Sequence, residues 1–186
     1  KINTINSELI LLKYNNSRLL RDLLHNAFDR CIDKWPKNPF DEICKFIDYR
    51  GRTPQKTSEG IPLITAKNVR MGKLNAHPYE YISEADYDSW MTRGIPRKGD
   101  ILFTTEAPLG NVAILDTNAK RVFAQRLVIL QPIIDSIRRR FLYYFLLSPQ
   151  FQEKLTQHST GTTVKGIKTK VMKKFDIPIP SSEEQN

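Results

Sequence analysis

Apolar residues recur at alternating spacings of three and four over the first part of the chain. One line of positions at this spacing contains Ile2, Ile5, Leu9, Leu12, Asn16, Leu19, Leu23 and Asn26. The spacing is the heptad pattern of a coiled coil, in which a buried Asn can fix the register of two helices. It predicts a helix from residue 1 to about residue 34 that pairs with another helix. The alternative is an amphipathic helix that packs only within its own domain.

The end of this helix carries a second apolar line, formed by Leu20, Leu24, Ala27 and Cys31. A wider apolar face predicts that this end also packs on the body of the protein. Trp35-Pro36 and Pro39 end the helix, because proline lacks a backbone N–H and keeps the preceding residue out of the helical region.

Beyond Pro39, short apolar runs alternate with turns rich in glycine, proline and polar residues. The runs predict strands over 42–48, 61–64, 101–104, 112–115 and 122–130, and helices over 84–91, 136–147 and 149–157. Elements mixed in this way predict a mixed α/β (α+β) fold class. We expect a curved, mainly antiparallel sheet with flanking helices, plus a long N-terminal helix of the coiled-coil type.

The chain of 186 residues carries 29 lysines and arginines against 20 acidic residues, which gives a formal charge of +9. This balance favours a polyanionic partner, either nucleic acid or an anionic membrane surface. No apolar run approaches the roughly 20 residues that span a bilayer, and the polar start Lys1-Ile2-Asn3-Thr4 is not a signal peptide. We therefore expect a cytoplasmic location, with Cys31 and Cys44 as free thiols, and a chain that is part of a longer protein.

The segment 151–185 predicts contacts to phosphate groups. A helix there leads into the small-residue loop Ser159-Thr160-Gly161-Thr162-Thr163, and no acidic residue occurs between Lys154 and Phe175. Hydroxyl groups and exposed backbone N–H groups donate to phosphate oxygens, and lysines add electrostatic attraction. The predicted phosphate contacts are Thr162, Thr163, Lys165, Lys168 and Lys170. A solvated lysine face beside an ordinary turn would give the same pattern.

Sequence motifs of catalysis are missing. The chain contains no Gly-x-Gly and no Gly-x-x-x-x-Gly-Lys, so neither a dinucleotide fingerprint nor a P-loop is recognisable. Its histidines and cysteines are too scattered for a zinc motif. No acidic residue has a lysine two positions after it, as is common in metal-dependent nucleases. The chain is predicted to be non-catalytic, with no metal or cofactor of its own.

Several short motifs beyond Phe40 occur in a characteristic order. They are Arg50-Gly51-Arg52-Thr53-Pro54, Gly60-Ile61-Pro62-Leu63-Ile64 with Asn68-Val69, Tyr81-Ile82-Ser83, Lys98-Gly99-Asp100-Ile101-Leu102-Phe103, Ala107-Pro108-Leu109-Gly110-Asn111-Val112-Ala113, Ala124-Gln125-Arg126, Ser159-Thr160-Gly161-Thr162-Thr163, and Ile177-Pro178-Ile179-Pro180 followed by Glu184-Gln185. Together they make the chain from about Phe40 onward resemble a target recognition domain of the specificity (S) subunit of type I restriction–modification systems. One departure is that Arg50 and Arg52 flank a single glycine where many members carry Gly-Gly-Thr-Pro.

The resemblance implies a spacer or dimerisation helix at residues 1–36 and a DNA target recognition domain at residues 37–186. It also implies a non-catalytic component that reads one half of a bipartite site in double-stranded DNA through the major groove. Methyltransferase (M) and restriction (R) subunits would be its partners and would bring S-adenosylmethionine, ATP and Mg²⁺. The spacer helix would pair with a second spacer helix, in cis or by homodimerisation, and no membrane partner is implied.

The same resemblance places further loops beside DNA. The residues proposed there are Arg50, Arg52, Thr53, Lys67, Asn68, Gln125 and Arg126. Arginine can form paired bonds with guanine, and asparagine or glutamine with adenine. Other roles stay open: Arg52 as a phosphate contact, Asn68 as the cap of a turn, and Gln125 as a core-facing residue.

Two other functions are compatible with the sequence. The chain could be the recognition domain of a longer single-chain restriction–methylation enzyme, which would also contain a methyl-donor-binding domain. It could instead be a basic coiled-coil assembly protein without sequence preference, which would bind all duplexes equally with a steep dependence on salt. The ordered set of motifs favours the specificity subunit.

Overall fold

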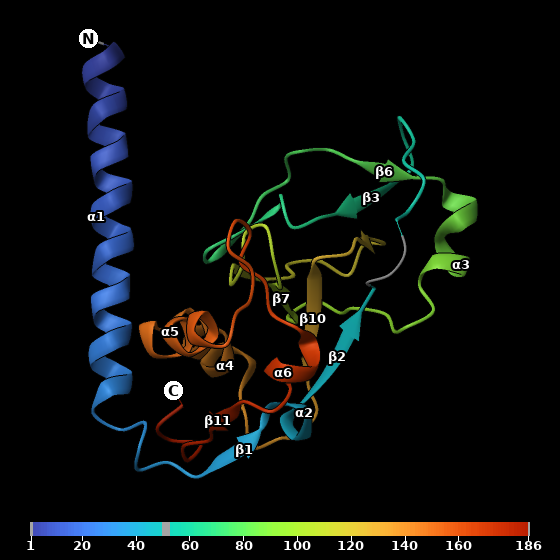
Figure 1. Cartoon of the computed structure of the whole chain (residues 1–186). Coiled ribbons are helices and arrows are strands. Elements are labelled where there is room, and N and C mark those ends of the chain that lie inside the picture. The colour runs from blue at the N-terminus through green and yellow to red at the C-terminus, as the bar shows by residue number, and fades with distance from the viewer. Residues whose placement is uncertain (1, 50–52, 186) are drawn as a thin grey trace.

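The structure of the chain, a computed structural model, describes residues 2–49 and 53–185, with side chains from residue 16 onward. Its helices are α1 (Ile2–Asp29), α2 (Phe40–Ile43), the 3-10 helix η1 (Glu84–Asp86), α3 (Tyr87–Trp90), α4 (Arg139–Leu147), α5 (Pro149–Gln157) and α6 (Thr169–Met172). Its strands are β1 (Lys37–Pro39), β2 (Cys44–Asp48), β3 (Ile61–Ile64), β4 (Val69–Arg70), β5 (Lys73–Leu74), β6 (Tyr81–Ile82), β7 (Ile101–Thr104), β8 (Val112–Ile114), β9 (Val122–Phe123), β10 (Leu127–Pro132) and β11 (Asp176–Pro178). Figure 1 shows α1 standing beside the body, which we define as residues 37–180.

The centre of the body is a four-stranded antiparallel sheet in the order β2-β10-β7-β8. Alternate residues of β7 enter two separate hydrophobic cores, with Ile101 and Phe103 in one and Leu102 in the other. Side chains alternate across a strand, so both faces of the sheet are covered. This explains why the strands appear in the sequence as continuous apolar runs.

One face of the central sheet packs against a three-stranded sheet in the order β6-β3-β9. Strand β3 pairs antiparallel with β6 and parallel with β9, where Leu63 lies opposite Val122 and Ile64 opposite Phe123. Trp90 of α3 joins this core, and its indole N–H donates to the Phe123 carbonyl oxygen at 3.2 Å. The parallel β3/β9 pair sets the geometry of the candidate site.

Helices α4 and α5 contribute to the core on the other face of the central sheet, and the last turns of α1 lie against both of them. Leu24 and Phe28 of α1 are buried there. The Phe28 ring meets those of Phe141 and Phe145 edge-on, with centroids 5.7 and 5.4 Å apart. The prediction that this end of the helix packs on the body is confirmed, but the contact is made by Leu24 and Phe28, whereas Leu20 and Ala27 of the predicted line are exposed.

The outward side of the same turns is solvent-exposed. Leu19 is 58% exposed and Leu23 is 57% exposed, and Asn16 and Asn26 lie on the same exposed line. The other members of the predicted seam, Ile2, Ile5, Leu9 and Leu12, have side chains outside the described residues. Within the described residues, no other part of the chain covers Leu19 and Leu23.

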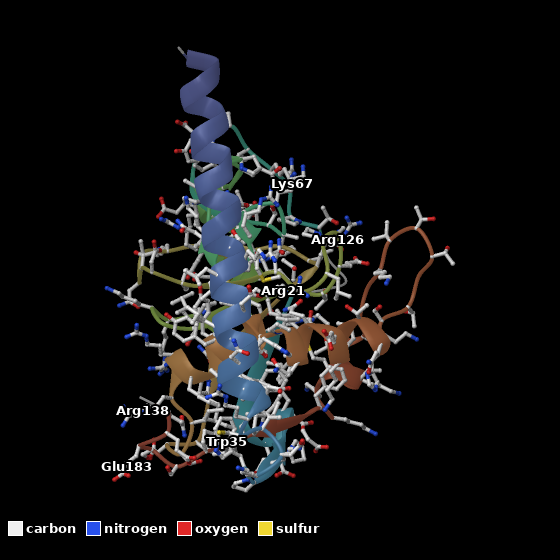
Figure 2. The ribbon with its side chains drawn as sticks, turned by 90° about the vertical axis from the view of Figure 1, so that its left-hand side faces the viewer. Arg21, Trp35, Lys67, Arg126, Arg138 and Glu183 are labelled. Atoms are coloured by element: carbon white, nitrogen blue, oxygen red, sulfur yellow. The ribbon has the colours of Figure 1, made fainter. Side chains whose placement is uncertain are left out.

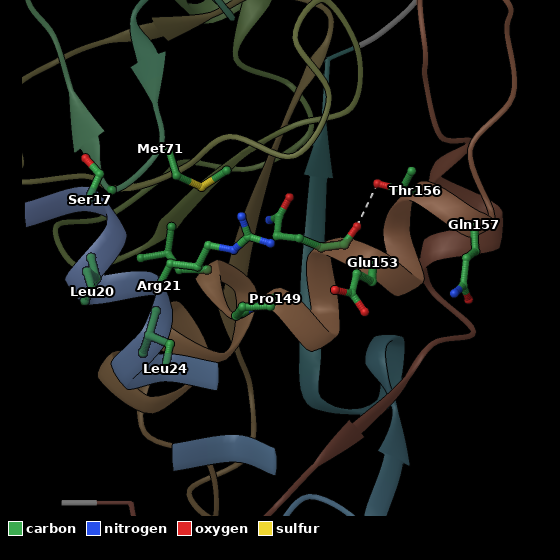
Figure 3. A pocket seen from close by; sticks show the side chains of 12 residues that line it. Ser17, Leu20, Arg21, Leu24, Met71, Pro149, Glu153, Thr156 and Gln157 are labelled. Atoms are coloured by element: carbon green, nitrogen blue, oxygen red, sulfur yellow. Dashed lines mark hydrogen bonds between the residues drawn. The ribbon is translucent and has the colours of Figure 1, made fainter. Parts of the chain in front are cut away.

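A groove of about 620 Å³ separates α1 from α5 and from the turn between β4 and β5. Its lining includes Leu20, Arg21, Leu24, Met71, Pro149 and Gln152, and Figure 3 shows the Arg21 side chain extending from α1 into it. The groove lies above the packed contact of Leu24 and Phe28. Helix α1 is therefore attached to the body chiefly by its last turns.

The two ends of the body lie side by side. Strands β1 and β11 pair antiparallel, with Asn38 opposite Ile177. The pairing continues outward, because the Ile179 N–H donates to the Pro36 carbonyl oxygen at 2.8 Å. Beyond it, the Trp35 indole N–H donates to Glu184 Oε1 at 3.0 Å. Segments more than a hundred residues apart in sequence thus close the lower end of the body (Figure 1).

The mixed α/β class and the mainly antiparallel pairing are confirmed, but the strands do not form one curved sheet. They are divided among four small sheets. The strand predicted over 122–130 is in fact two strands of different sheets, because Arg126 adopts φ +73° and interrupts the extended backbone. Helix α1 ends at Asp29 rather than near residue 34, since the N–H groups of Cys31 and Ile32 both bond to the Phe28 carbonyl and the chain tightens into turns. Helix α4 begins at Arg139, three residues after the predicted start.

Candidate nucleic-acid interface

Two turns lie side by side where β3 and β9 end. Parallel strands point the same way, so their carboxyl ends lie at the same edge of a sheet. Residues 65–68 follow β3 and residues 124–126 follow β9, and the Ala124 N–H donates to the Ile64 carbonyl oxygen at 2.9 Å. We call this pair of turns the β3/β9 edge. It places the turn of Lys67 and Asn68 beside the turn of Gln125 and Arg126.

Asn68 builds this edge from within. Its side chain is 1% exposed, and its Oδ1 accepts from the Thr65 N–H at 2.9 Å and the Thr65 hydroxyl at 3.0 Å. Its Nδ2 donates to the carbonyl oxygens of Asn75, Ala76 and Pro78 at 3.3, 3.1 and 3.0 Å. An amide has two donor hydrogens and two acceptor lone pairs, so none is left for a base. With its amide fully used inside the chain, Asn68 fits the alternative role that the sequence left open for it, the cap of a turn.

Lys67 points out of the same turn and is 70% exposed, with its Nζ 3.9 Å from Glu80 Oε1. Lys56 approaches the same carboxylate, with its Nζ 3.0 Å from Glu80 Oε2. Glu80 is mostly buried and so holds two ammonium groups at the surface. Such a pair suits a phosphate oxygen. Lys56 was not predicted from the sequence, because its position depends on the bridge between Thr57 and Tyr81.

The turn after β9 presents Gln125 and Arg126. The Gln125 amide donates to the Thr53 hydroxyl at 3.3 Å, so these two predicted residues are in contact, and Gln125 is half-buried. The Arg126 side chain is 52% exposed, and its Nε lies 3.1 Å from Oε1 of Glu106, which is 44% exposed. Arg126 has φ +73°, a left-handed conformation that a residue with a Cβ adopts at some cost and that gathers at functional sites.

A protruding loop adjoins Arg126 and Glu106. Thr160 and Gly166 exchange two backbone hydrogen bonds of 2.9 Å, which close residues 160–166 into what we call the finger. Gly161 has φ +103°, and a Cβ there would lie 2.1 Å from the Val164 carbonyl oxygen, so the finger requires glycine. Thr162, Thr163 and Lys165 are exposed on it. Figure 2 shows the finger extending from the body on the same side as Arg126.

The base of the finger is joined to the central sheet. The Ile167 N–H donates to the Thr105 carbonyl oxygen, the Thr105 N–H donates to the Arg126 carbonyl oxygen, and both distances are 2.9 Å. Glu106 and Gly166 form an antiparallel bridge. Three segments far apart in sequence, 104–106, 124–127 and 166–167, therefore lie side by side, and they connect the β3/β9 edge to the finger.

The lysines between residues 154 and 174 include two groups, of which the first was predicted to contact phosphate. All three predicted lysines are exposed, with Lys165 in the finger, Lys168 just before α6 and Lys170 within α6. Lys154 instead lies over the Phe175 ring at 4.9 Å, and its partial burial lowers the pKa of its ammonium group. Lys173 lies over the Phe46 ring in the same way. The second group packs on the body rather than facing a partner.

The predicted residues are thus mostly brought together on one continuous surface. It contains Thr53, Lys67, Gln125, Arg126, Thr162, Thr163, Lys165 and Lys168. Arg50 and Arg52 lie outside the described residues. Over the described ranges, no group of three or more His, Cys, Asp or Glu side chains is arranged to hold a metal ion. The surface offers ammonium, guanidinium and hydroxyl donors together with the exposed carboxylate of Glu106 and the mostly buried carboxylate of Glu80, and the excess of donors suits binding to a polyanion.

The sequence of the chain matches a known protein family. Residues 32–186 match the family described as the type I restriction modification DNA specificity domain. The chain belongs to this family. The match begins just after α1 and covers the whole body. Of the helices that the structure describes, none has the length and apolar character needed to cross a bilayer.

Curated members of the family are similar to the chain in sequence. The EcoBI specificity subunit of a type I restriction enzyme from Escherichia coli is 30% identical over 128 residues, which is 69% of this chain and 27% of that protein. The MjaVIII specificity subunit from Methanocaldococcus jannaschii is 25% identical over 201 residues, or 99% of this chain and 47% of that protein. The chain thus spans between about a quarter and a half of the length of these relatives.

Solved structures share the fold. The HsdS subunit from Thermoanaerobacter tengcongensis superimposes with a TM-score of 0.64 at 20% identity, covering 98% of this chain and 44% of that one. A chain from work on complex assembly and conformational transition of the type I R-M system gives a TM-score of 0.62 at 20% identity, covering 99% of this chain and 46% of that one. The mixed α/β body is therefore the fold of specificity subunits.

Proposed function

We propose that the chain recognises a specific sequence in double-stranded DNA, as one half of a bipartite site, and directs other subunits to it. The observation that carries this proposal is the continuous surface formed by the β3/β9 edge and the finger. Eight residues from four separate segments meet there, and the family to which the chain belongs is a DNA specificity domain. Its donors match phosphate oxygens and base edges.

The surface combines the two kinds of contact that sequence-specific binding needs. Protruding groups with hydroxyls and ammonium ions, on the finger and around Lys67, suit the phosphate backbone. Backbone hydrogen bonds to the neighbouring strands hold the turn of Gln125 and Arg126 in place. Such a rigid support suits base reading, because a side chain that reads a base must be positioned accurately. The outline of the surface, a protruding finger beside a flat edge, suits a groove of duplex DNA.

The test is selection of bound sequences from a random duplex library by the full-length protein together with its methyltransferase subunit. We expect enrichment of one defined half-site. Equal recovery of all duplexes, with a steep salt dependence, would favour the basic assembly protein without sequence preference and overturn the proposal. A methyl-donor-binding domain in the same polypeptide would identify the longer single-chain enzyme instead.

The partners follow from the same assignment. Methyltransferase and restriction subunits are proposed to supply the chemistry, with S-adenosylmethionine, ATP and Mg²⁺ bound in those subunits. The described residues of this chain would then bind and orient DNA only. Methylation of the selected duplex by the complex, and its loss when the finger is deleted, would tie the recognition surface to the partner's activity.

Helix α1 is proposed to be a spacer that pairs with a second spacer helix, in cis or by homodimerisation. The supporting observation is the exposed line of Leu19 and Leu23, opposite the buried Leu24 and Phe28. Exposed leucines on a heptad line are what a coiled-coil partner covers. The double variant Leu19→Asp and Leu23→Asp should keep the fold but lose helix pairing, measured by light scattering of the fragment and by assembly of the full chain. Arg18→Ala, on an exposed position of the same helix, is the control.

A further inference from the structure

The Glu106 side chain lies between the β3/β9 edge and the finger. It follows β7 and forms an antiparallel bridge with Gly166 at the base of the finger. The approach is close, because a Cβ on Gly166 would lie 3.2 Å from the Glu106 Cβ. The backbone therefore fixes where the Glu106 side chain begins, and the ion pair with Arg126 places its carboxylate between the two parts of the proposed DNA surface.

The carboxylate contributes little that the fold requires. Its partner atom is Nε of Arg126 at 3.1 Å, and both side chains are about half exposed. Exposed ion pairs of this kind add little stability. The neighbouring segments are already joined by backbone bonds from Thr105 to Arg126 and to Ile167.

The carboxylate is also unfavourable for binding to the DNA backbone. Phosphates repel it, and each cation it neutralises is one fewer for phosphate contacts. In a DNA groove, a carboxylate has one favourable partner class, the exocyclic amino group of a base, and the amino group of cytosine is its usual one. The adjacent guanidinium of Arg126 offers donors that fit the O6 and N7 atoms of guanine.

We propose that Glu106 is a specificity-determining residue that accepts a hydrogen bond from a cytosine amino group, with Arg126 positioned by the same contact to read guanine. The inference rests on the proposed function, since it requires that this surface face duplex DNA. It adds a residue that the motifs alone do not mark, because contacts with the distant residues Gly166 and Arg126 bring Glu106 to the interface.

The experiment compares wild type, Glu106→Gln and Glu106→Ala in the full-length protein with its methyltransferase subunit, using the random duplex library. In both variants we expect discrimination for cytosine at one position to fall about tenfold or more, and Glu106→Gln to shift that position toward adenine. Binding to unrelated duplexes should be unchanged or stronger, because a negative charge has been removed. Glu84→Gln, in the exposed ion pair with Lys120, is the matched control and should select the wild-type site.

The outcomes separate the two proposals. Wild-type protein that enriches no site would overturn the proposed function and this inference with it. Wild-type protein that enriches a site, with both Glu106 variants keeping the same preference at every position, would overturn this inference alone. A purely structural role for Glu106 predicts a lowered urea midpoint with equal weakening on all sequences, and that result would also overturn it.

Discussion

The two turns of the β3/β9 edge occupy equivalent places in the fold and use their polar side chains in opposite ways. The Asn68 side chain points inward, and its amide forms hydrogen bonds with Thr65 and with three backbone carbonyl groups. Arg126 turns outward, and its turn is held by backbone bonds at Ala124 and Thr105 that need no side chain. The first turn therefore needs asparagine at position 68 in order to fold. The second turn folds without needing a contact from the Arg126 side chain, which is left available to contact DNA.

The largest effect we expect comes from breaking the inward turn. Asn68→Ala leaves the Thr65 N–H and three carbonyl groups without their side-chain partner, and should lower the free energy of unfolding by about 3 kcal/mol. Urea unfolding at fixed salt measures it. Gln55→Ala, at an exposed loop position, is the control and should stay within about 0.5 kcal/mol. A loss below about 1 kcal/mol for Asn68→Ala would show that the backbone alone holds the turn.

The outward turn should respond in binding rather than in folding. Arg126→Ala should weaken binding to the selected DNA site by about 2 kcal/mol and relax preference at one base position. Its effect on unfolding should be small, because alanine and arginine both carry a Cβ and bear the same strain at φ +73°. Competition between selected and scrambled duplexes at fixed salt gives the comparison, with Arg139→Ala at the start of α4 as the control. Equal weakening on both duplexes would assign Arg126 to the phosphate backbone.

Lys165 on the finger should contact only the phosphate backbone and read no base. Lys165→Ala should weaken binding to every duplex by about 1 kcal/mol and reduce the slope of log affinity against log salt by about one unit. The reason is that an exposed ammonium group releases one condensed counterion when it meets a phosphate. Affinities measured at several salt concentrations test this. An unchanged slope would remove Lys165 from the phosphate contacts.

The smallest effect is expected one position from the largest. Lys67 lies next to Asn68 in sequence, but it is exposed and its contact with Glu80 is 3.9 Å long. Lys67→Ala should therefore change the free energy of unfolding by less than about 0.5 kcal/mol. Urea unfolding of the two adjacent variants under the same conditions sharpens the comparison. A loss for Lys67→Ala that approached that of Asn68→Ala would show that the pairing with Glu80 is structural.

Sequence patterns predicted most elements of the fold. They failed for elements whose presence or ends depend on contacts between residues far apart in the sequence. The continuous apolar runs of β7 and β10 predicted strands because both faces of the central sheet are buried. The run at 122–130 contains no glycine or proline to mark the break, so the left-handed Arg126 that separates β9 from β10 was not predicted. The short strands β1 and β11 were not predicted either, since each exists only through pairing with a distant partner.

The candidate site was predicted to a similar extent. Motif order and charge named Gln125, Arg126 and the finger residues as candidates, and the structure places them near one another because backbone bonds join the turn after β9 to the base of the finger. The role of Asn68 depends on carbonyl groups seven to ten residues away, and neither spacing nor composition records which way an amide points. Glu106, which we propose as a further site residue, was not predicted, because its neighbour, Gly166, is sixty residues along the chain.

The pairing of β1 with β11 has a consequence for how such proteins can change over generations. The chain enters the body next to Pro36 and leaves it next to Ile179, and these two residues are joined by a backbone hydrogen bond. The two ends of the body therefore lie together at one place. An inserted domain whose ends lie together disturbs its host least. Recombination at these two points could therefore exchange one body for another in a single event while the adjoining helix keeps its direction.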